Sequence, residues 1–274
     1  MIGTVFIIDS GYMIERQFKM IFESHAHYDD KAFSDDRDSL LRSMEENGIG
    51  TIVNVTAEYS SIQATYELSK KYNFIYGTVG IHPSEVEELD DEKFSKMYEM
   101  AKRDKVVAIG EIGLDYYWPE PDHDIQKKWF IRQLQMAKEL DMPVIIHSRD
   151  AAADTLEILK SDAAKGLRGV IHCYSYSKEM AVEFEKLGYY FGIGGVVTFQ
   201  NAKKLIEVVE YLPIEKILLE TDSPYLSPMP NRGKRNSSLN IPYIAEKIAQ
   251  IKDIPYDMVV EITERNARKL YFAE

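Results

Sequence analysis

One stretch decides the fold of this chain: Val106-Val107-Ala108-Ile109-Gly110-Glu111-Ile112-Gly113-Leu114-Asp115-Tyr116-Tyr117. It is a short apolar run, rich in β-branched residues, that stops at a glycine and then presents the carboxylate of Glu111. Such a run predicts a buried strand whose last residue faces a site.

Other apolar runs end in the same way, on a histidine or an acid. The run from Met20 leads to His25 and His27, that from Gly77 to His82, that from Val144 to His147, that from Gly169 to His172, and that from Ile217 to Asp222. In a parallel (β/α)8 barrel the carboxyl ends of all strands open onto one face, and the active site is built there. The sequence therefore predicts an α/β fold of the TIM-barrel type.

Length and spacing agree with one barrel. The chain has 274 residues, and such barrels need roughly 250 residues, about 31 for each strand and helix. Apolar residues at three- and four-residue steps predict helices between the strands, most clearly over 124–141. The strands are predicted to begin near Met20, Thr51, Phe74, Lys105, Pro143, Arg168, Tyr189 and Lys216, and the other helices to lie over 60–72, 92–103, 154–160, 177–187, 202–211, 242–251 and 256–270.

The first residues do not fit this plan. We expect residues 1–19 to be an N-terminal extension outside the catalytic fold and residues 20–274 to form a single barrel, with a strand added to the edge of the fold as the alternative. The apolar part of the extension is too short for a membrane span and has no basic region ahead of it, which argues against a signal peptide. We therefore expect a cytoplasmic protein without a membrane segment and without an obligate protein partner.

Composition limits the kinds of site. The single cysteine, Cys173, excludes an intramolecular disulfide and a cysteine-based zinc cluster, so a metal must be bound by histidine and carboxylate. The net charge of −12 argues against a broad nucleic-acid surface, although a small basic or metal-bearing cleft remains compatible with it. The run Gly192-Ile193-Gly194-Gly195 lacks a dinucleotide-binding pattern and predicts a strand end where backbones crowd.

The histidines and acids at the strand ends indicate a metal centre. His25 and His27 alternate along an extended segment, so both rings can bind one cation. A purely structural role for all six groups would bury many polar atoms, each costing about 1–3 kcal/mol if unsatisfied. The six exceed the four ligands of a tetrahedral ion and suit two divalent ions, Mg²⁺, Mn²⁺ or Zn²⁺, bridged by a carboxylate. The set is His25, His27, Glu111, His147, His172 and Asp222.

Seven segments together resemble the TatD family of metal-dependent deoxyribonucleases, which belongs to the amidohydrolase-type barrels. They are S-H-A-H-Y-D-D from Ser24, G-I-H-P from Gly80, G-E-I-G-L-D-Y-Y from Gly110, P-V-I-I-H-S-R-D-A from Pro143, H-C-Y-S from His172, L-L-E-T-D-S-P-Y-L from Leu218 and R-G-K-R-N from Arg232. The resemblance runs from about Met20 to the end of the chain. Only the first 19 residues depart from it.

The resemblance implies a ligand set for each ion and a reaction. His25, His27, Glu111 and Asp222 would hold one ion, and the bridging Glu111 would join His147 and His172 at the other. The implied activity is hydrolysis of DNA phosphodiester bonds by a metal-activated water, with Asp222 and Glu111 as catalytic residues and Asp222 as candidate general base. We expect a 3′-5′ exonuclease on single-stranded ends, because extended duplex binding requires more positive surface.

Several side chains are candidate substrate contacts. The resemblance makes His82 a phosphate contact, with a hydrogen bond inside its loop as the alternative. Arg149 can reach a phosphate or a nearby acid. Tyr116, Tyr117 and Trp118 can stack on bases or pack under the loop. The irregular stretch 223–240 concentrates three cations, for which we favour phosphate binding, with a solvated loop as the alternative: Arg232, Lys234 and Arg235.

Two other functions stay open at this point. The same two-metal site could hydrolyse an ester or amide, as in an aminoacyl-tRNA deacylase, and product release from such substrates would distinguish it from a nuclease. The chain could also be a non-catalytic metal-binding protein, which would retain nucleic acid without cleaving it.

Overall fold

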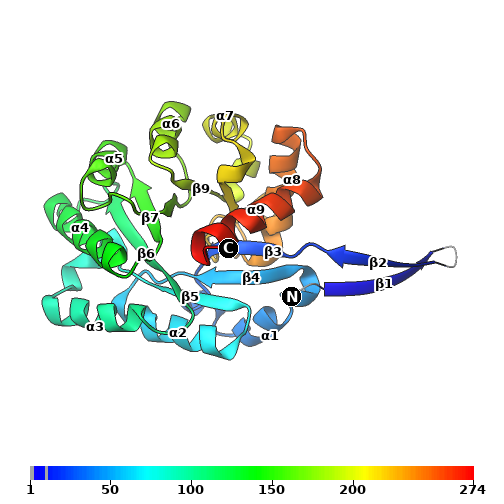
Figure 1. Ribbon diagram of the computed structural model, residues 1–274, viewed down its shortest axis with the longest axis horizontal. Helices are drawn as coiled ribbons and strands as arrows, with labels where there is room; N and C mark the ends of the chain where they lie inside the picture. Colours follow the sequence, from blue (N-terminus) through cyan, green and yellow to red (C-terminus); the bar gives the residue numbers. More distant parts are fainter. Residues whose placement is uncertain (1–2, 10–11) are drawn as a thin grey trace.

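Eight parallel strands form one curved sheet that closes almost completely into a barrel (Figure 1). The computed structural model describes residues 3–9 and 12–274. Each strand pairs with the next one in the chain, so the predicted (β/α)8 TIM barrel is confirmed. The strands are β3 (Ile21–Ala26), β4 (Ile49–Asn54), β5 (Ile75–Val79), β6 (Val106–Asp115), β7 (Val144–Arg149), β8 (Gly169–Ile171), β9 (Tyr190–Ile193) and β10 (Ile217–Leu219).

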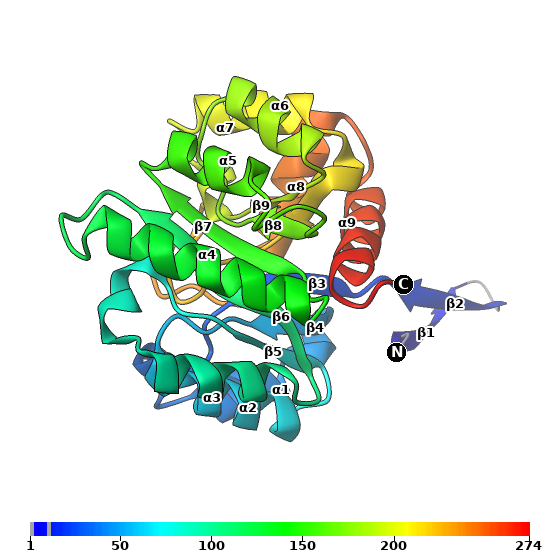
Figure 2. The ribbon, with the colours of Figure 1, turned by 60° about the vertical axis from the view of Figure 1, so that its left-hand side comes forward.

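Helices lie on the outside of the barrel (Figure 2). The eight predicted helices are confirmed, and α1 is an addition, because six residues are too few to display a helical period. The helices are α1 (Arg37–Arg42), α2 (Ile62–Lys71), α3 (Asp91–Ala101), α4 (His123–Glu139), α5 (Ala152–Lys160), α6 (Lys178–Lys186), α7 (Lys203–Tyr211), α8 (Ile241–Lys252) and α9 (Tyr256–Tyr271). Short 3-10 helices are η1 (Lys31–Phe33), η2 (Glu45–Asn47), η3 (Tyr59–Ser61), η4 (Pro83–Glu88), η5 (Gly195–Thr198), η6 (Ile214–Lys216) and η7 (Ser238–Asn240).

Alternation along the strands divides the core into two clusters. In β7, Val144 and Ile146 belong to the cluster that includes the buried helix faces, whereas Ile145 belongs to a second cluster together with inward residues of the other strands. The end of α9 joins this second cluster, where Tyr271 stacks on Phe22 with ring centroids 5.8 Å apart. The barrel interior is therefore filled with side chains, which leaves its carboxyl face for a site.

Side chains close the seam between β10 and β3, where the ladder is reduced to one bridge between Ala26 and Ser223. The buried carboxyl of Glu23 accepts hydrogen bonds from Thr221 N at 2.9 Å and Thr221 Oγ1 at 2.6 Å. Burial raises the pKa of Glu23 to about 8. These hydrogen bonds hold the segment after β10 against β3, the first strand of the barrel.

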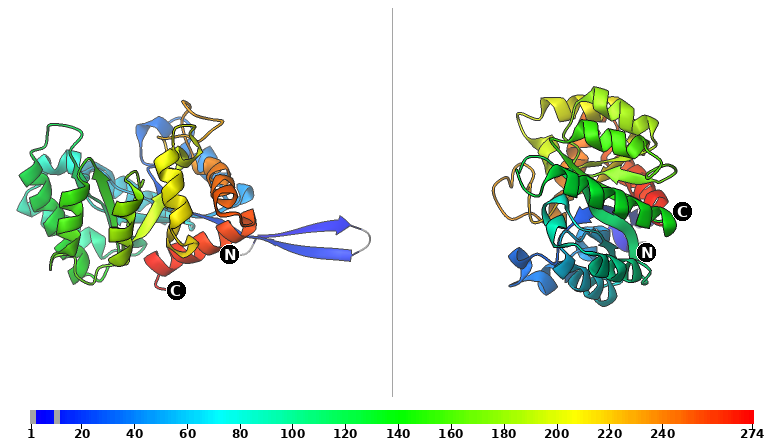
Figure 3. Two further views of the ribbon diagram at one scale, coloured as in Figure 1. Left: turned by 90° about the horizontal axis from the view of Figure 1, so that it is seen from above. Right: turned by 90° about the vertical axis from the view of Figure 1, so that its left-hand side faces the viewer.

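The N-terminal segment forms a separate sheet. Strands β1 (Gly3–Asp9) and β2 (Tyr12–Phe18) pair antiparallel with each other and extend away from the barrel (Figure 3). The expected independence of residues 1–19 from the catalytic fold stays a prediction. Residues 1–2 and 10–11 of that segment lie outside the described part. Within that part, every helix is too short or too polar to cross a lipid bilayer.

Candidate metal centre

The predicted ligands meet at the carboxyl face of the barrel. Five of them line a cavity of about 1000 Å³, and the sixth, His25, is buried beneath it. The cavity arises because parallel strands end together while the loops that follow them stand up around the opening. The six side chains come from five strands or from the residues that follow them. His25 lies in β3 and His27 follows it, Glu111 and His147 lie within β6 and β7, His172 follows β8, and Asp222 belongs to the loop after β10. The prediction that Glu111 ends its strand was wrong, because β6 continues to Asp115 and pairs with β7 over these last residues.

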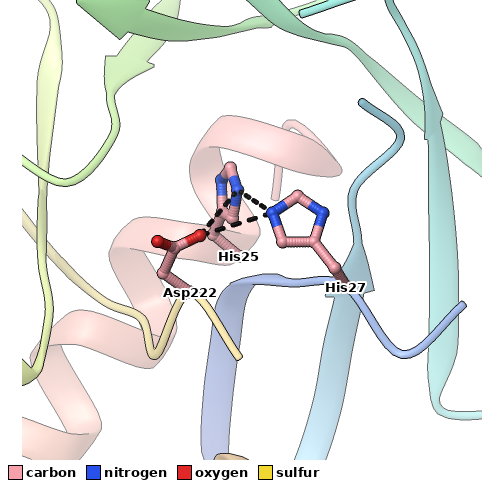
Figure 4. A group of neighbouring side chains, drawn as sticks. All are labelled: His25, His27 and Asp222. Carbon is pink, nitrogen blue, oxygen red and sulfur yellow. Dashed lines mark hydrogen bonds and ion pairs between the residues drawn. The ribbon is translucent and has the colours of Figure 1, made fainter. Parts of the chain in front are cut away.

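His25, His27 and Asp222 form the first group that could hold a metal ion (Figure 4). The two Nε2 atoms are 3.1 Å apart, and Asp222 Oδ1 lies 3.8 Å from His25 Nε2 and 3.3 Å from His27 Nε2. Asp222 reaches this place from a backbone with φ of 58°, and its amide donates to His25 O at 3.0 Å. A strained backbone held by such contacts is common at functional sites.

Glu111 lies between two histidine pairs. Its Oε2 is 3.5 Å from His25 Nε2 and 3.8 Å from His27 Nε2, whereas its Oε1 is 2.8 Å from His147 Nδ1 and 3.1 Å from His172 Nε2. Burial opposes ionisation, but the charges of His172 and His25 and the hydrogen bond with His147 outweigh it and hold the pKa of Glu111 well below its usual range. Oε2 of the ionised carboxylate therefore faces His25 and His27, whereas Oε1 faces His147 and His172, with His82 Nε2 farther away at 3.9 Å.

Partners outside the ligand set fix two of the rings. His27 Nδ1 lies 2.8 Å from Val55 O, so it donates a proton there and leaves Nε2 free to bind a cation. His147 Nε2 lies 3.1 Å from Asp115 Oδ2. The other ring nitrogen of His147, Nδ1, therefore points toward Glu111. Metal-binding histidines typically have such partners. The donor set therefore fits divalent cations. Asp115 was not assigned a role from sequence, although it ends the strand that carries Glu111.

Gly113 sets the approach of β6 to the strand that carries His147. The two residues are register partners, and a Cβ at Gly113 would lie 1.9 Å from His147 O. The φ of Gly113 is 147°, which L side chains rarely adopt. Only glycine therefore allows the close approach that holds His147 beside Glu111.

Glu220 is a second buried carboxyl that sequence reasoning missed. Cys173 N donates to Glu220 Oε1 at 2.6 Å, and His172 Nδ1 is 3.4 Å from the same oxygen. A Cβ at Gly192 would lie 2.0 Å from Glu220 Oε2, a side-chain atom. The predicted crowding of backbones at this strand end is found at Gly195, where a Cβ would lie 2.1 Å from Leu226 O. Among the described residues, His25 Nδ1, His172 Nδ1 and Glu220 Oε2 have no hydrogen-bond partner. Glu220 therefore lies within ion-pair distance of the His172 ring but does not form a hydrogen bond with it.

Charge at the site favours protons on three of the rings. One of them is His147, where burial is outweighed by hydrogen bonds with Asp115 and Glu111, which raise the pKa. Burial opposes the charged form of His27, but the hydrogen bond and charge of Asp222 outweigh it and raise the pKa of His27 to about 9. Burial is likewise outweighed at His172, where the charges of Glu111 and Glu220 raise the pKa well above its usual range. Without a metal, the site therefore binds protons where a cation would lie.

His82 faces the cavity and also makes the loop contact that was its alternative role. Its Nδ1 accepts a hydrogen bond from Ser84 N at 3.1 Å, so the ring proton is on Nε2, which lies 3.9 Å from Glu111 Oε1. Burial, and then the charge of His147, lower the pKa of His82 to about 3. His82 is therefore a neutral hydrogen-bond donor toward the cavity.

The predicted cations divide between the cavity and its surroundings. Arg149 lines the cavity, whereas none of the three loop cations belongs to its lining. Arg235 pairs with Asp36, at 2.6 Å between Nη2 and Oδ2, and the Arg232 guanidinium lies 4.3 Å from the Phe199 ring centroid. Phosphate binding by Arg232, Lys234 and Arg235 stays a prediction, and it would concern the outer rim.

Comparison with known proteins agrees with the geometry. The family described as TatD related DNase matches residues 22–272. The metal-dependent hydrolase YabD of Bacillus subtilis is 39% identical over 252 residues, which cover 92% of this chain and 99% of the relative. The metal-dependent hydrolase YcfH of Escherichia coli is 32% identical over 254 residues, covering 92% of this chain and 95% of the relative.

A solved structure shows the same fold. The TatD homologue YjjV of Escherichia coli superposes with a TM-score of 0.87 at 29% sequence identity, covering 93% of this chain and 99% of that one. The family match spans nearly the whole barrel and includes every predicted metal ligand. This chain therefore belongs to the TatD family and is a metal-dependent hydrolase.

Proposed function

We propose that the protein hydrolyses phosphodiester bonds of DNA, acting as a 3′-5′ exonuclease on single-stranded ends. The observation that carries this proposal is the Glu111 carboxylate, each of whose oxygens faces a separate pair of histidines at the floor of an open cavity. Such an arrangement suits two cations bridged by one carboxylate, which is a common device for in-line displacement at phosphorus.

The ligands divide into two sets around Glu111. His25, His27 and Asp222 would hold one ion with Oε2, and His147 and His172 would hold the other with Oε1. When bound, Mg²⁺, Mn²⁺ or Zn²⁺ would neutralise the phosphodiester and lower the pKa of water. The donor atoms are compatible with all three metals.

Three side chains would act on the substrate. Burial opposes ionisation of Asp222, but its hydrogen bond with His27 and the charge of His172 lower its pKa, so this cavity-lining carboxylate can accept the proton of an attacking water. Neutral His82 would donate its Nε2 proton to a phosphate oxygen. Arg149, at the cavity wall, would contribute positive charge to the transferring phosphate.

Charge around the cavity supports action at strand ends. The acids Asp29, Asp30, Glu58 and Glu85 line the cavity wall and outnumber its two cations, Lys31 and Arg149, so a long polyanion would be repelled. Arg149 lines the same cavity and provides a cationic exit. One terminal phosphodiester could therefore enter the site while the rest of the strand leaves past Arg149.

The test uses metal-stripped full-length protein and a 5′-labelled single-stranded DNA, with Mg²⁺, Mn²⁺ or Zn²⁺ added in turn. We expect a metal-dependent ladder of products shortened from the 3′ end. A 3′-terminal phosphorothioate should delay the ladder, because the first bond then resists hydrolysis.

Variants make this test specific. Glu111→Ala and the near-isosteric Glu111→Gln should abolish the ladder, while Glu207→Ala, which changes an exposed residue of α7, should leave it unchanged. Circular dichroism of each variant shows whether the barrel is intact. Bound metal without cleavage by the wild-type protein would refute the nuclease proposal and direct the same assay to ester and amide substrates, including acylated tRNA.

A further inference from the structure

Three consecutive aromatic residues follow β6, and the structure separates their roles. Tyr116 is a structural residue, since its OH donates to Asp154 Oδ2 at 2.8 Å and its ring stacks on His123 with centroids 3.6 Å apart. In contrast, Tyr117 and Trp118 are 52% and 55% exposed. Their rings meet edge to face with centroids 4.8 Å apart. The predicted role of packing under the loop therefore applies to Tyr116. It does not account for the exposed rings of Tyr117 and Trp118.

One of the two exposed rings, Trp118, lines the proposed catalytic cavity, and Tyr117 contacts it edge to face. Trp118 and Arg149 line the cavity together with Glu111 and Asp222. The Arg149 guanidinium stacks on the Tyr117 ring, 3.7 Å from its centroid, and forms no ion pair with any other described residue. An exposed indole thus lies beside a stacked but un-neutralised cation at the rim.

The exposed aromatic ring and the cation at this rim indicate which class of ligand binds there. A nucleotide presents a flat base and an anionic phosphate side by side, and bases stack on aromatic rings in single-strand binders without regard to sequence. The acids of the cavity lining, which include Asp30 and Glu58, outnumber the cation Lys31 among them and disfavour a strand that passes over them. The ring and the cation together therefore match a nucleotide that leaves the cavity over this edge.

We propose that Trp118, supported by the Tyr117–Arg149 stack, is a nucleobase-binding subsite that holds the nucleotide adjoining the scissile phosphate. This inference rests on the proposed nuclease function, because it assigns the base of the same substrate. It predicts that affinity for a strand depends on a base at its end and little on which base is present.

The kinetic test compares Trp118→Ala on two single-stranded substrates, one normal and one lacking the three terminal bases. On normal DNA the KM should rise about 5- to 150-fold, the loss expected for one base–aromatic stack, with kcat within about twofold. On the abasic strand the same substitution should change KM by less than about twofold. Trp118→Phe should restore much of the affinity, and Tyr243→Ala, an exposed ring of α8 outside the cavity, should have no effect.

A binding measurement separates this inference from the proposed function. The chain has two tryptophans, and Trp129 is only 4% exposed. Stacking on Trp118 should therefore quench fluorescence when a phosphorothioate oligonucleotide, which resists hydrolysis, is added to the metal-loaded protein. Trp118→Phe should remove the quenching.

The outcomes are distinct. Absence of cleavage with base-dependent quenching would overturn the nuclease proposal and retain the subsite. Cleavage with an unchanged KM in Trp118→Ala, or with an equal loss on the abasic strand, would overturn the subsite and retain the nuclease. Absence of both cleavage and quenching would overturn both.

Discussion

Substitution of Gly192 by alanine should destabilise the barrel through its effect on Glu220. The new Cβ would lie 2.0, 2.5 and 2.8 Å from Glu220 Oε2, Cδ and Oε1, so the carboxyl group has to move. Overpacking of this kind costs about 1–3 kcal/mol. Movement of Glu220 also breaks the 2.6 Å hydrogen bond from Cys173 N, which is part-buried, and loss of such a bond costs roughly 0.5–1.5 kcal/mol more. With the overpacking cost, we expect a total loss of about 1.5–4.5 kcal/mol.

Urea unfolding of the metal-free protein measures this loss, and a double-mutant cycle with Glu220→Ala tests its cause. Removal of the carboxyl group also removes the clash, so the double variant should be more stable than the sum of the single losses predicts, by about 1–3 kcal/mol. Gly194→Ala is the matched control, because its nearest neighbour would be 3.5 Å away, an ordinary contact. Additivity within about 0.5 kcal/mol would show that Glu220 does not occupy the space that Gly192 leaves.

Four further predictions follow from the site. Asp115→Ala should weaken binding of one metal ion by about 10- to 100-fold in calorimetric titrations, because its histidine partner loses its orientation. Metal binding at pH 7.5 should release protons into the buffer, since the pKa of His27 is raised to about 9 in the metal-free site. Arg149→Ala should raise the KM for DNA more than Arg235→Ala does. A chain that begins at Met20 should keep the unfolding temperature and metal binding of the full chain.

The sign of the pH effect follows from the same shift. A ring that is protonated up to pH 9 stabilises the metal-free fold fully below about pH 6.5, and this contribution is lost as the pH rises through about 9. Metal must displace that proton, so apparent metal affinity should fall as the pH falls, by up to about tenfold per pH unit for each displaced proton. A metal affinity independent of pH between 6 and 8 would contradict the proposed occupation of the site by protons.

Controls fit each of the other predictions. Glu207→Ala changes an exposed acid that is not part of the cavity lining and should leave the metal affinity unaltered, in contrast to Asp115→Ala. If the outer rim, and not the cavity wall, binds the terminal phosphate, Arg235→Ala should raise the KM for DNA more than Arg149→Ala does. Loss of cooperative unfolding in the chain that begins at Met20 would assign residues 1–19 to the barrel.

Strand ends could be predicted from the sequence because two local signals coincided. An apolar run of β-type residues marks a buried strand, and a histidine or acid just beyond it marks the open face. Parallel pairing then brings these ends together without any need for long-range information. This reasoning placed His25, Glu111 and His172 at one site although 147 positions separate the first from the last.

Pairings made by the fold across distant segments could not be predicted. Arg235 reads as a free loop cation, yet its partner Asp36 lies 199 positions away. Glu220 and Asp222 are two positions apart and would share a face of a regular strand, but β10 ends at Leu219 and Asp222 has a positive φ, so only Asp222 reaches the cavity lining. The direction of each acid therefore depends on backbone geometry that a local pattern does not encode.

The balance of charge explains how an acidic protein can attract a phosphodiester. Glu111, Asp115 and Asp222 all have lowered pKa values, so the centre carries three negative charges, and the raised pKa values of His27, His147 and His172 favour protons that offset them. Two divalent ions in the proposed positions would displace those protons and supply four positive charges, leaving one in excess. The metal-loaded floor would then be positive within a wall that repels polyanions elsewhere. Attraction confined to the floor, and not spread over the surface, is what favours entry of a single terminal phosphodiester.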